Sequence, residues 1–330
     1  MALLSGAMKK QKVRIKLETL NKMGLGCWGL GGDAYGYITT SEAISLLDRA
    51  YSYGVRFFDL SNLYGAGRAE VIFGEWMMSL EASKRETISF VSKAGLLPHS
   101  SFEMPTDFDI NSLRIEIQRS CKRLGIQKLP IFLLHSPSSE QLTQLNLEHL
   151  SNSLKAEALI DEFGVSFRAP GDLALINLQY IDWAELNINL MDMRINTDKK
   201  LISSLYEKNV RIIARTPLAF GFLTQGGVSD SDIKSPLSHL RNWDTDQIAV
   251  WRKGATEFAK YADKLKLSIN ELALSFCASL EFVDKVIPGA MTKMHVDKNY
   301  SRLVNLTHSE QNTLLEIYNK NIFYVQKKLS

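Results

Sequence analysis

The chain alternates between short apolar segments and longer amphipathic ones. In residues 39–53, apolar positions recur at three- and four-residue spacing, which is typical of a helix, and Thr39 and Glu42 fit a capping box at its start. Residues 55–60 (VRFFDL) then predict a buried strand. Further strands are expected at 25–30, 88–91, 131–134, 163–167, 183–188, 210–214 and 286–287.

The amphipathic segments between these strands predict the helices. Asp109 and Gly125 fit the start and the stop of one of them. A segment rich in Gly, Ser and Asp, residues 224–238, predicts a loop. Helices are expected at 39–53, 69–80, 109–124, 147–160, 172–178, 199–208, 248–265, 269–280, 296–303 and 309–324.

The pattern amounts to about eight strand–helix repeats, which predict parallel strands joined by helices. About eight such units favour a closed barrel over an open sheet. The expected fold is therefore a single-domain (β/α)8 TIM barrel over residues 20–305, with an extra C-terminal helix in residues 306–330. Residues 1–19 are expected to form a tail and a hairpin at the barrel bottom.

Composition narrows the classes of protein. The 330 residues are 45% hydrophobic, which excludes a mainly disordered chain, and 39 Lys and Arg against 36 Asp and Glu are too balanced for a dedicated nucleic-acid binder. The three cysteines, Cys27, Cys121 and Cys277, form no C-x-x-C pair, so we expect neither disulfides nor a zinc site. With no apolar run long enough for a membrane span, the chain is expected to be cytoplasmic, with no membrane partner.

In such barrels, the chemistry lies at the carboxyl ends of the strands. Ionisable residues, which are costly to bury unless they are paired, follow three successive predicted strands at Asp59, Lys93 and His135. The residues at the predicted strand ends are Trp28, Asp59, Lys93, His135, Ser166, Glu185, Arg215 and Pro288.

Together with Tyr64, which lies on the loop after Asp59, these groups suit carbonyl reduction. A neighbouring ammonium lowers the pKa of a phenol, a carboxylate holds the ammonium in place, and a histidine polarises a carbonyl. The set would protonate a carbonyl oxygen while a hydride arrives at the carbon, and the hydride needs a nicotinamide cofactor.

Eight short motifs in order now make the chain resemble the aldo-keto reductase superfamily over about residues 20–305. Each is weak alone, but each falls at or beside a predicted strand end. They are GLGCWGLGG at 24–32, GVRFFD at 54–59, LYG at 63–65, SK at 92–93, LHSP at 134–137, GVS at 164–166, PLAFGFLT at 217–224 and IPGA at 287–290, with Asn299 ten residues after Gly289.

The resemblance implies a role for each matching residue. Tyr64 would be the general acid, Lys93 would tune it, Asp59 would anchor Lys93, and His135 would orient the carbonyl. Trp28 and Tyr35 would line the substrate pocket. The cofactor, NADPH with NADH as the alternative, would meet Gly26, Ser166, Glu185, Arg215, Pro217, Leu218, Gly221, Leu223, Gly289, Thr292, Lys293, His295, Lys298 and Asn299.

The chain departs from the family pattern in the cofactor region. Phe167 replaces a common Asn, and Glu185 replaces a common Gln; a carboxylate accepts from an amide but cannot donate to it. Met291 and His295 stand where cations often read the 2′-phosphate of NADP. The cations available to replace them are Lys293, Lys298 and Arg302.

Three other functions stay open beside reduction of an aldehyde, ketone or sugar. The same groups would oxidise a sugar or alcohol in reverse, and a cofactor-binding sensor would keep the fold without the chemistry. A glycosidase would use paired carboxylates such as Asp59 and Glu185 but leave Tyr64 and Lys93 unexplained. No metal site is expected from the spacing of the histidines, and the oligomeric state is not predicted.

Overall fold

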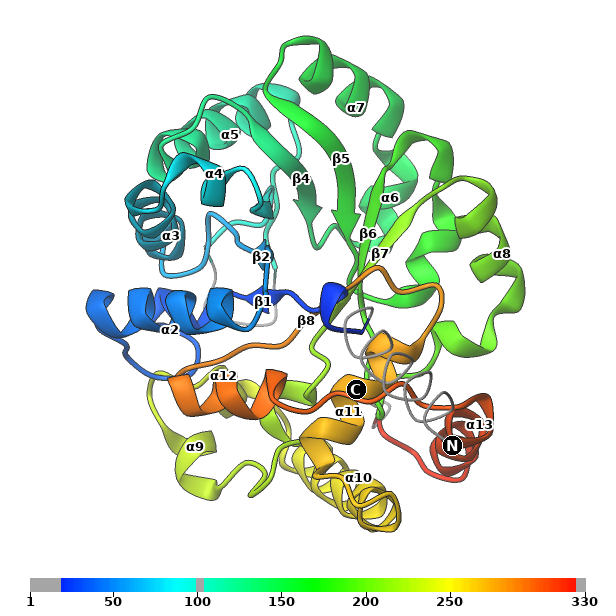
Figure 1. Ribbon diagram of the computed structural model, residues 1–330. Coiled ribbons are helices and arrows are strands. Elements are labelled where there is room, and N and C mark those ends of the chain that lie inside the picture. Colours follow the sequence, from blue (N-terminus) through cyan, green and yellow to red (C-terminus); the bar gives the residue numbers. More distant parts are fainter. Residues whose placement is uncertain (1–18, 99–103, 325–330) are drawn as a thin grey trace, which may run out of the picture.

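The structure is a computed structural model that describes residues 19–98 and 104–324. At its centre, one eight-stranded parallel sheet runs in chain order from β1 to β8 (Figure 1). Because parallel neighbours cannot be joined by a tight hairpin, each connection returns over the outside of the sheet. The strands are β1 Leu25–Gly26, β2 Phe57–Asp59, β3 Ser89–Ala94, β4 Leu129–His135, β5 Ile160–Ser166, β6 Trp183–Asn187, β7 Arg211–Arg215 and β8 Lys285–Ile287.

Hydrogen bonds between the first and last strands close the sheet into a barrel. The Gly24 amide donates to the Val286 carbonyl at 2.8 Å, and the Gly26 amide donates to the Pro288 carbonyl at 3.0 Å. Glycine is needed at 24, because a Cβ there would lie 2.8 Å from the Phe57 carbonyl oxygen. The (β/α)8 barrel predicted from the alternation is therefore confirmed.

Helices surround the barrel, as Figure 1 shows, and bury their apolar faces against the outer side of the strands. Residues at the helix ends determine where the helices begin and stop. For example, Asp109 caps the start of α5 (Ile110–Leu124), and Gly125, with a left-handed backbone conformation, ends it, as expected from the sequence. The α-helices are α2 Thr40–Ser52, α3 Arg68–Ser79, α4 Ala82–Arg85, α5 Ile110–Leu124, α6 Ser139–Gln144, α7 Leu147–Ala156, α8 Lys199–Glu207, α9 Asp230–Lys234, α10 Thr245–Lys264, α11 Ile269–Ser279, α12 Lys293–Tyr300 and α13 His308–Asn319.

Several predicted boundaries were wrong, each for a local reason. The helix expected at 147–160 ends at Ala156, because Ala158 takes a left-handed φ of 54° and Ile160 already opens β5. The segment predicted as helix at 172–178 is instead two 3-10 turns, η2 Pro170–Leu175 and η3 Leu178–Tyr180.

Capping boxes begin two helices that were not predicted from the sequence. Ser138 begins α6, and Ser229 begins α9 inside the segment predicted as a loop. The bounds of two other helices also differ from the predicted ones. α12 starts at Lys293, where Thr292 caps it, and α13 ends at Asn319. In the described residues, four further short 3-10 helices join the larger elements; they are η1 Trp28–Gly31, η4 Ile195–Thr197, η5 Ala219–Gly221 and η6 His239–Asn242.

After α13, the chain folds back on the barrel helices. Phe323 stacks on Phe258 of α10 with ring centres 5.7 Å apart, and its carbonyl accepts from the Gln247 side chain at 2.8 Å. The predicted N-terminal tail and hairpin lie, apart from Thr19, outside the described residues. In the part of the chain that the structure describes, no helix has the length and apolar character needed to cross a membrane.

The inside of the barrel is built in two layers. A cluster of buried apolar side chains from alternate positions of the strands fills the lower layer: Phe57, Val91, Ile131, Leu133, Trp183, Ile213 and Ile287. Successive strand residues point to opposite faces, so the residue two positions later again faces the interior. Those residues are Asp59, Lys93, His135, Glu185 and Arg215. The apolar layer therefore becomes the floor of a polar site at the carboxyl ends of the strands.

One glycine allows this floor to pack. A Cβ on Gly164 of β5 would overlap the Trp183 carbonyl and lie 2.7 Å from a Leu133 methyl carbon. We expect Gly164→Ala to lower the free energy of unfolding by about 1–3 kcal/mol, the usual cost of overpacking. Gly171→Ala is the matched control, because no atom lies within 4 Å of its added Cβ, and it should change stability by less than about 1 kcal/mol. Equal losses in urea unfolding would contradict this account of the floor.

Candidate active site

The centre of the site is the ammonium of Lys93, which lies one residue before the end of β3 and is 1% exposed. It forms an ion pair with Asp59 of β2 and donates to Oε2 of Glu185 on β6 at 3.3 Å. Both carboxylates are buried, so neither is compensated by water. A single ammonium thus links strands from opposite parts of the barrel.

Glu185 also gathers groups from the two strands beside it. Its Oε1 accepts from the Ser166 hydroxyl of β5 at 2.8 Å, and the Arg215 guanidinium of β7 approaches to 3.9 Å. The site therefore holds two carboxylates and two cations. This arrangement makes the charges of the four side chains cancel, which a low-dielectric interior requires.

Burial and charge act differently on the two carboxyl groups. Desolvation and the neighbouring charge of Glu185 raise the pKa of Asp59 to about 7, although Lys93 opposes them. Burial also works to raise the pKa of Glu185, but the charges of Lys93 and Arg215 and the hydrogen bond from Ser166 hold it well below its usual value. Of the two carboxyl groups, Asp59 is therefore the one that takes up a proton first as the pH falls.

Tyr64 lies over this charge network at the barrel mouth. Its hydroxyl donates to Oδ2 of Asp59 at 3.1 Å, and the Lys93 ammonium lies 5.2 Å from the centre of its ring. Burial raises the pKa of Tyr64 well above its usual value, the charges of Asp59 and Glu185 add to the rise, and Arg215 opposes it. The net shift of this pKa is thus upward, and the expected lowering by Lys93 stays a prediction.

His135, at the end of β4, completes the predicted set of four. Its ring centre is 6.3 Å from that of Tyr64, edge to face, and its Nδ1 lies 3.0 Å from the Ser61 hydroxyl. That hydroxyl also accepts from the Leu63 amide at 3.2 Å. When Ser61 donates to Nδ1, the imidazole proton is on Nε2, where it can polarise a carbonyl. The structure thus brings Asp59, Tyr64, Lys93 and His135 together.

The residues expected at the nicotinamide end lie beside the same network. Arg215 donates from Nη2 to the Phe167 carbonyl at 2.6 Å, while its buried Nε has no hydrogen-bond partner among the described residues. Phe167, where the family often has Asn, is fully buried. The Ser166 hydroxyl donates to Glu185, so these two predicted cofactor residues are hydrogen-bonded to each other in this structure.

The loop after β7 carries a run of left-handed backbone. Thr216, Ala219, Phe220 and Gly221 all have positive φ, at 51°, 45°, 57° and 98°. Non-glycine residues hold this conformation only where the surroundings enforce it, and such strain is concentrated at ligand clamps and active sites. The predicted contacts Pro217, Leu218, Gly221 and Leu223 belong to this loop; Leu218 and Leu223 are buried.

The remaining predicted cofactor residues lie around the start of α12. Thr292 caps the helix by accepting from the His295 amide, and Asn299 donates to the Gly289 carbonyl at 3.2 Å. Lys298 is exposed, and its charge together with burial lowers the pKa of His295, which is therefore neutral. Gly26 contacts this region through its bridge to Gly289.

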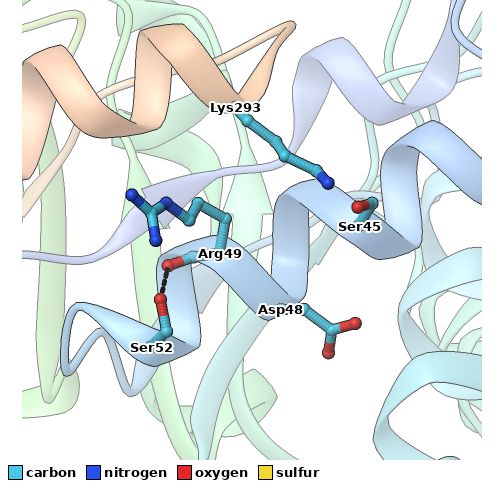
Figure 2. A pocket seen from close by; sticks show the side chains of 5 residues that line it. All are labelled: Ser45, Asp48, Arg49, Ser52 and Lys293. Carbon is cyan, nitrogen blue, oxygen red and sulfur yellow. Dashed lines mark hydrogen bonds between the residues drawn. The ribbon is translucent and has the colours of Figure 1, made fainter.

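Lys293 points across to α2 rather than along the α12 face of Lys298. Figure 2 shows its amine beside Ser45, in a shallow polar hollow of about 230 Å³ that is also lined by Asp48, Arg49 and Ser52. The adjacent Arg49 is paired with Asp297 of α12 at 2.6 Å. Arg302, the third alternative cation, lies 3.7 Å from Glu271.

An aromatic wall leads outward from Tyr64. Trp28 stacks on it, with ring centres 6.1 Å apart and planes at 27°, and Tyr35 contacts Trp28 edge to face at 5.4 Å. Both predicted substrate residues therefore lie at the mouth.

The sequence reading missed His239 in this wall, because it stands in a polar loop with no motif. Its ring contacts Trp28 at 4.8 Å and Tyr35 at 4.7 Å, and its amide donates to the Ala34 carbonyl at 3.0 Å. This bond ties the long loop after β7 to the mouth of the barrel. Within the described ranges, no three His, Cys, Asp or Glu side chains gather where they would hold a metal ion.

Comparison with known proteins agrees with this fold. The model of the Aldo/keto reductase family matches residues 22–319. The chain is 25% identical to the uncharacterized oxidoreductase YqkF of Bacillus subtilis over 86% of this chain and 87% of that protein, and 23% identical to L-galactose dehydrogenase of Arabidopsis thaliana, covering 92% and 93%. A solved glycerol dehydrogenase of Gluconobacter oxydans superposes with a TM-score of 0.72 at 20% identity, covering 94% of each chain.

The chain belongs to the aldo/keto reductase family, and the superfamily resemblance drawn from its motifs is confirmed. It is an oxidoreductase of the NAD(P)-dependent type.

Breaking the buried ion pairs of the site should lower the stability of the protein by a measurable amount. Lys93→Met would leave two carboxylates facing each other without an ammonium. We expect it to lower the free energy of unfolding at neutral pH by about 3–5 kcal/mol. Lys128→Met is the control, because its pair with Asp161 is exposed and should contribute less than about 1 kcal/mol. Urea unfolding of both variants checks this, and similar losses would refute the stabilising role of Lys93.

Proposed function

We propose that this protein reduces the carbonyl group of an aldehyde, ketone or sugar, with Tyr64 as the general acid and NADPH as the preferred cofactor. The observation that carries the proposal is the placement of the Tyr64 hydroxyl. It lies at the mouth of the barrel, next to His135, above a buried network that keeps it protonated. A protonated phenol beside an imidazole suits protonation of a carbonyl oxygen.

Each residue of the set has a distinct task in this reaction. The bound cofactor supplies a hydride to the carbonyl carbon. His135 donates a hydrogen bond to the carbonyl oxygen from Nε2, and Tyr64 transfers its proton to that oxygen, which yields the alcohol. Asp59 accepts from Tyr64 and, with Lys93, fixes its hydroxyl; the phenolate that forms is reprotonated from solvent.

The residues of the chain fit a nicotinamide dinucleotide. The buried Nε of Arg215, which donates no hydrogen bond in the described part of the chain, and the strained loop after β7 suggest a place for a polar ligand along the top of the barrel. His295 is neutral, Lys293 points to α2 and Arg302 approaches Glu271, so Lys298 is the cation we assign to the 2′-phosphate of NADPH.

The reverse reaction is the second candidate. L-galactose dehydrogenase and glycerol dehydrogenase are named for the oxidation of alcohols, and the same four side chains would serve oxidation, with Tyr64 as the base. A sensor has no need of the complete set of four, and a glycosidase has no need of Tyr64 and Lys93. A cytoplasmic location, with a small-molecule substrate and no membrane or nucleic-acid partner, belongs to the same proposal.

Tyr64→Phe tests the general acid. The variant loses the hydroxyl but keeps the ring that stacks on Trp28, so the fold and cofactor affinity should remain. We expect kcat for carbonyl reduction to fall by about 10²–10⁴-fold, the usual contribution of a proton donor. Tyr37→Phe, at a side chain that is 72% exposed, should leave turnover unchanged. Parent-like turnover in Tyr64→Phe would eliminate this mechanism.

The cofactor preference is testable by fluorescence titration with NADPH and, separately, with NADH. Trp28, near the expected nicotinamide position, should report binding through quenching, and Trp28→Phe identifies its share among the five tryptophans. We expect tighter binding of NADPH, and about a tenfold loss of NADPH affinity in Lys298→Ala with NADH unaffected. Lys320→Ala, directly after α13, is the control. Equal affinity of the parent for both cofactors would refute the phosphate contact.

A further inference from the structure

We propose that Glu185 is a positioning residue that shares the Lys93 ammonium with Asp59 and thereby keeps the Tyr64 hydroxyl in its proton-donating form. The proposal gives Glu185 a task other than the cofactor contact expected from the sequence. Its consequence for turnover rests on the proposed function, whereas its effect on Tyr64 itself does not.

The hydrogen bonds of Glu185 show that its carboxylate is held in a fixed position. Both of its oxygens are bound within the protein: Oε1 accepts from Ser166 at 2.8 Å, and Oε2 accepts from Lys93 at 3.3 Å. The side chain is 2% exposed, so it is fixed in place by β5 and β3. A carboxylate held in this way acts on its surroundings mainly through its charge.

The charge acts on Tyr64 through Lys93. An ammonium beside a phenol stabilises the phenolate, but one that already neutralises two carboxylates has little net effect on a third group. With Asp59 alone, Lys93 would form a neutral pair; with Glu185 as well, the trio carries one excess negative charge when both carboxylates are ionised. That excess disfavours a phenolate directly above it.

The ionisable groups facing Tyr64 come from five strands. Asp59 and Glu185 oppose loss of its proton, and Arg215 favours it. Lys93 lies 5.2 Å from the ring centre, and His135 packs edge to face against the ring. Arg215 is partly exposed and 3.9 Å from Glu185, so it offsets the excess charge only in part.

Glu185→Gln isolates this effect, because glutamine has the same shape and can still accept from Ser166. Above pH 8, Asp59 is ionised in both proteins: its pKa is about 7 in the parent and falls when the charge of Glu185 is removed. The alkaline titration of Tyr64 therefore reports the loss of one negative charge. We expect its pKa to fall by about one pH unit or more.

The first measurement is ultraviolet absorbance of tyrosinate against pH. The chain has eleven tyrosines, so the signal of Tyr64 is taken as the difference between each protein and its own Tyr64→Phe version. The second is the pH profile of kcat/KM for carbonyl reduction, whose alkaline limb should move to lower pH by the same amount. A purely structural defect would lower the profile without moving its limb.

Glu162→Gln on β5 is the matched control. Glu162 pairs with Arg211 and accepts from the Trp183 indole at 2.6 Å, two residues before the apolar floor position of Gly164, so its charge lies below the floor. It should leave the ionisation of Tyr64 unchanged. The proposal is overturned if Glu185→Gln and the parent ionise Tyr64 at the same pH. A shift in a parent that reduces no carbonyl would instead support the role of Glu185 and refute the proposed function.

Discussion

The burial of Lys93 is the constraint on which the site depends. An ammonium that is 1% exposed is tolerated only when counter-charges are held within bonding distance, and here they come from β2 and β6. Asp59 precedes Lys93 by 34 residues and Glu185 follows it by 92. β2, β3 and β6 meet around this ammonium because the sheet closes into a barrel. The ion network therefore depends on the fold.

The apolar floor gives this network its electrostatic character. Phe57, Val91 and Trp183 stand two residues before Asp59, Lys93 and Glu185, so each charge lies on a packed hydrocarbon layer. Burial on this layer disfavours the charged forms of Asp59 and Tyr64, which raises the pKa of both groups. The chemistry of the upper layer therefore depends on the packing of the lower one, down to the missing side chain of Gly164.

Local patterns in the sequence predicted the order of the elements and the four residues at the barrel mouth. This worked because strand alternation, helix caps and the rule that chemistry lies at strand ends act within a few residues. The pairing of Glu185 with Lys93 was not predictable in this way, because it depends on which side chains meet across the barrel. The end of α7 at Ala156 and the position of His239 were missed for a similar reason: tertiary contacts, not periodicity, determine them.

Two departures from the family pattern, Phe167 and Glu185, are linked through Arg215. This arginine brings a cation to the top of β7, and its Nη2 donates to the carbonyl of Phe167. With glutamine at 185, Arg215 and Lys93 would face Asp59 alone, and the buried site would carry one excess positive charge. Glutamate at 185 restores the balance while retaining the bond from Ser166. Arg215 and Glu185 are therefore coupled, and Arg215 opposes the effect of Glu185 on the pKa of Tyr64 without cancelling it.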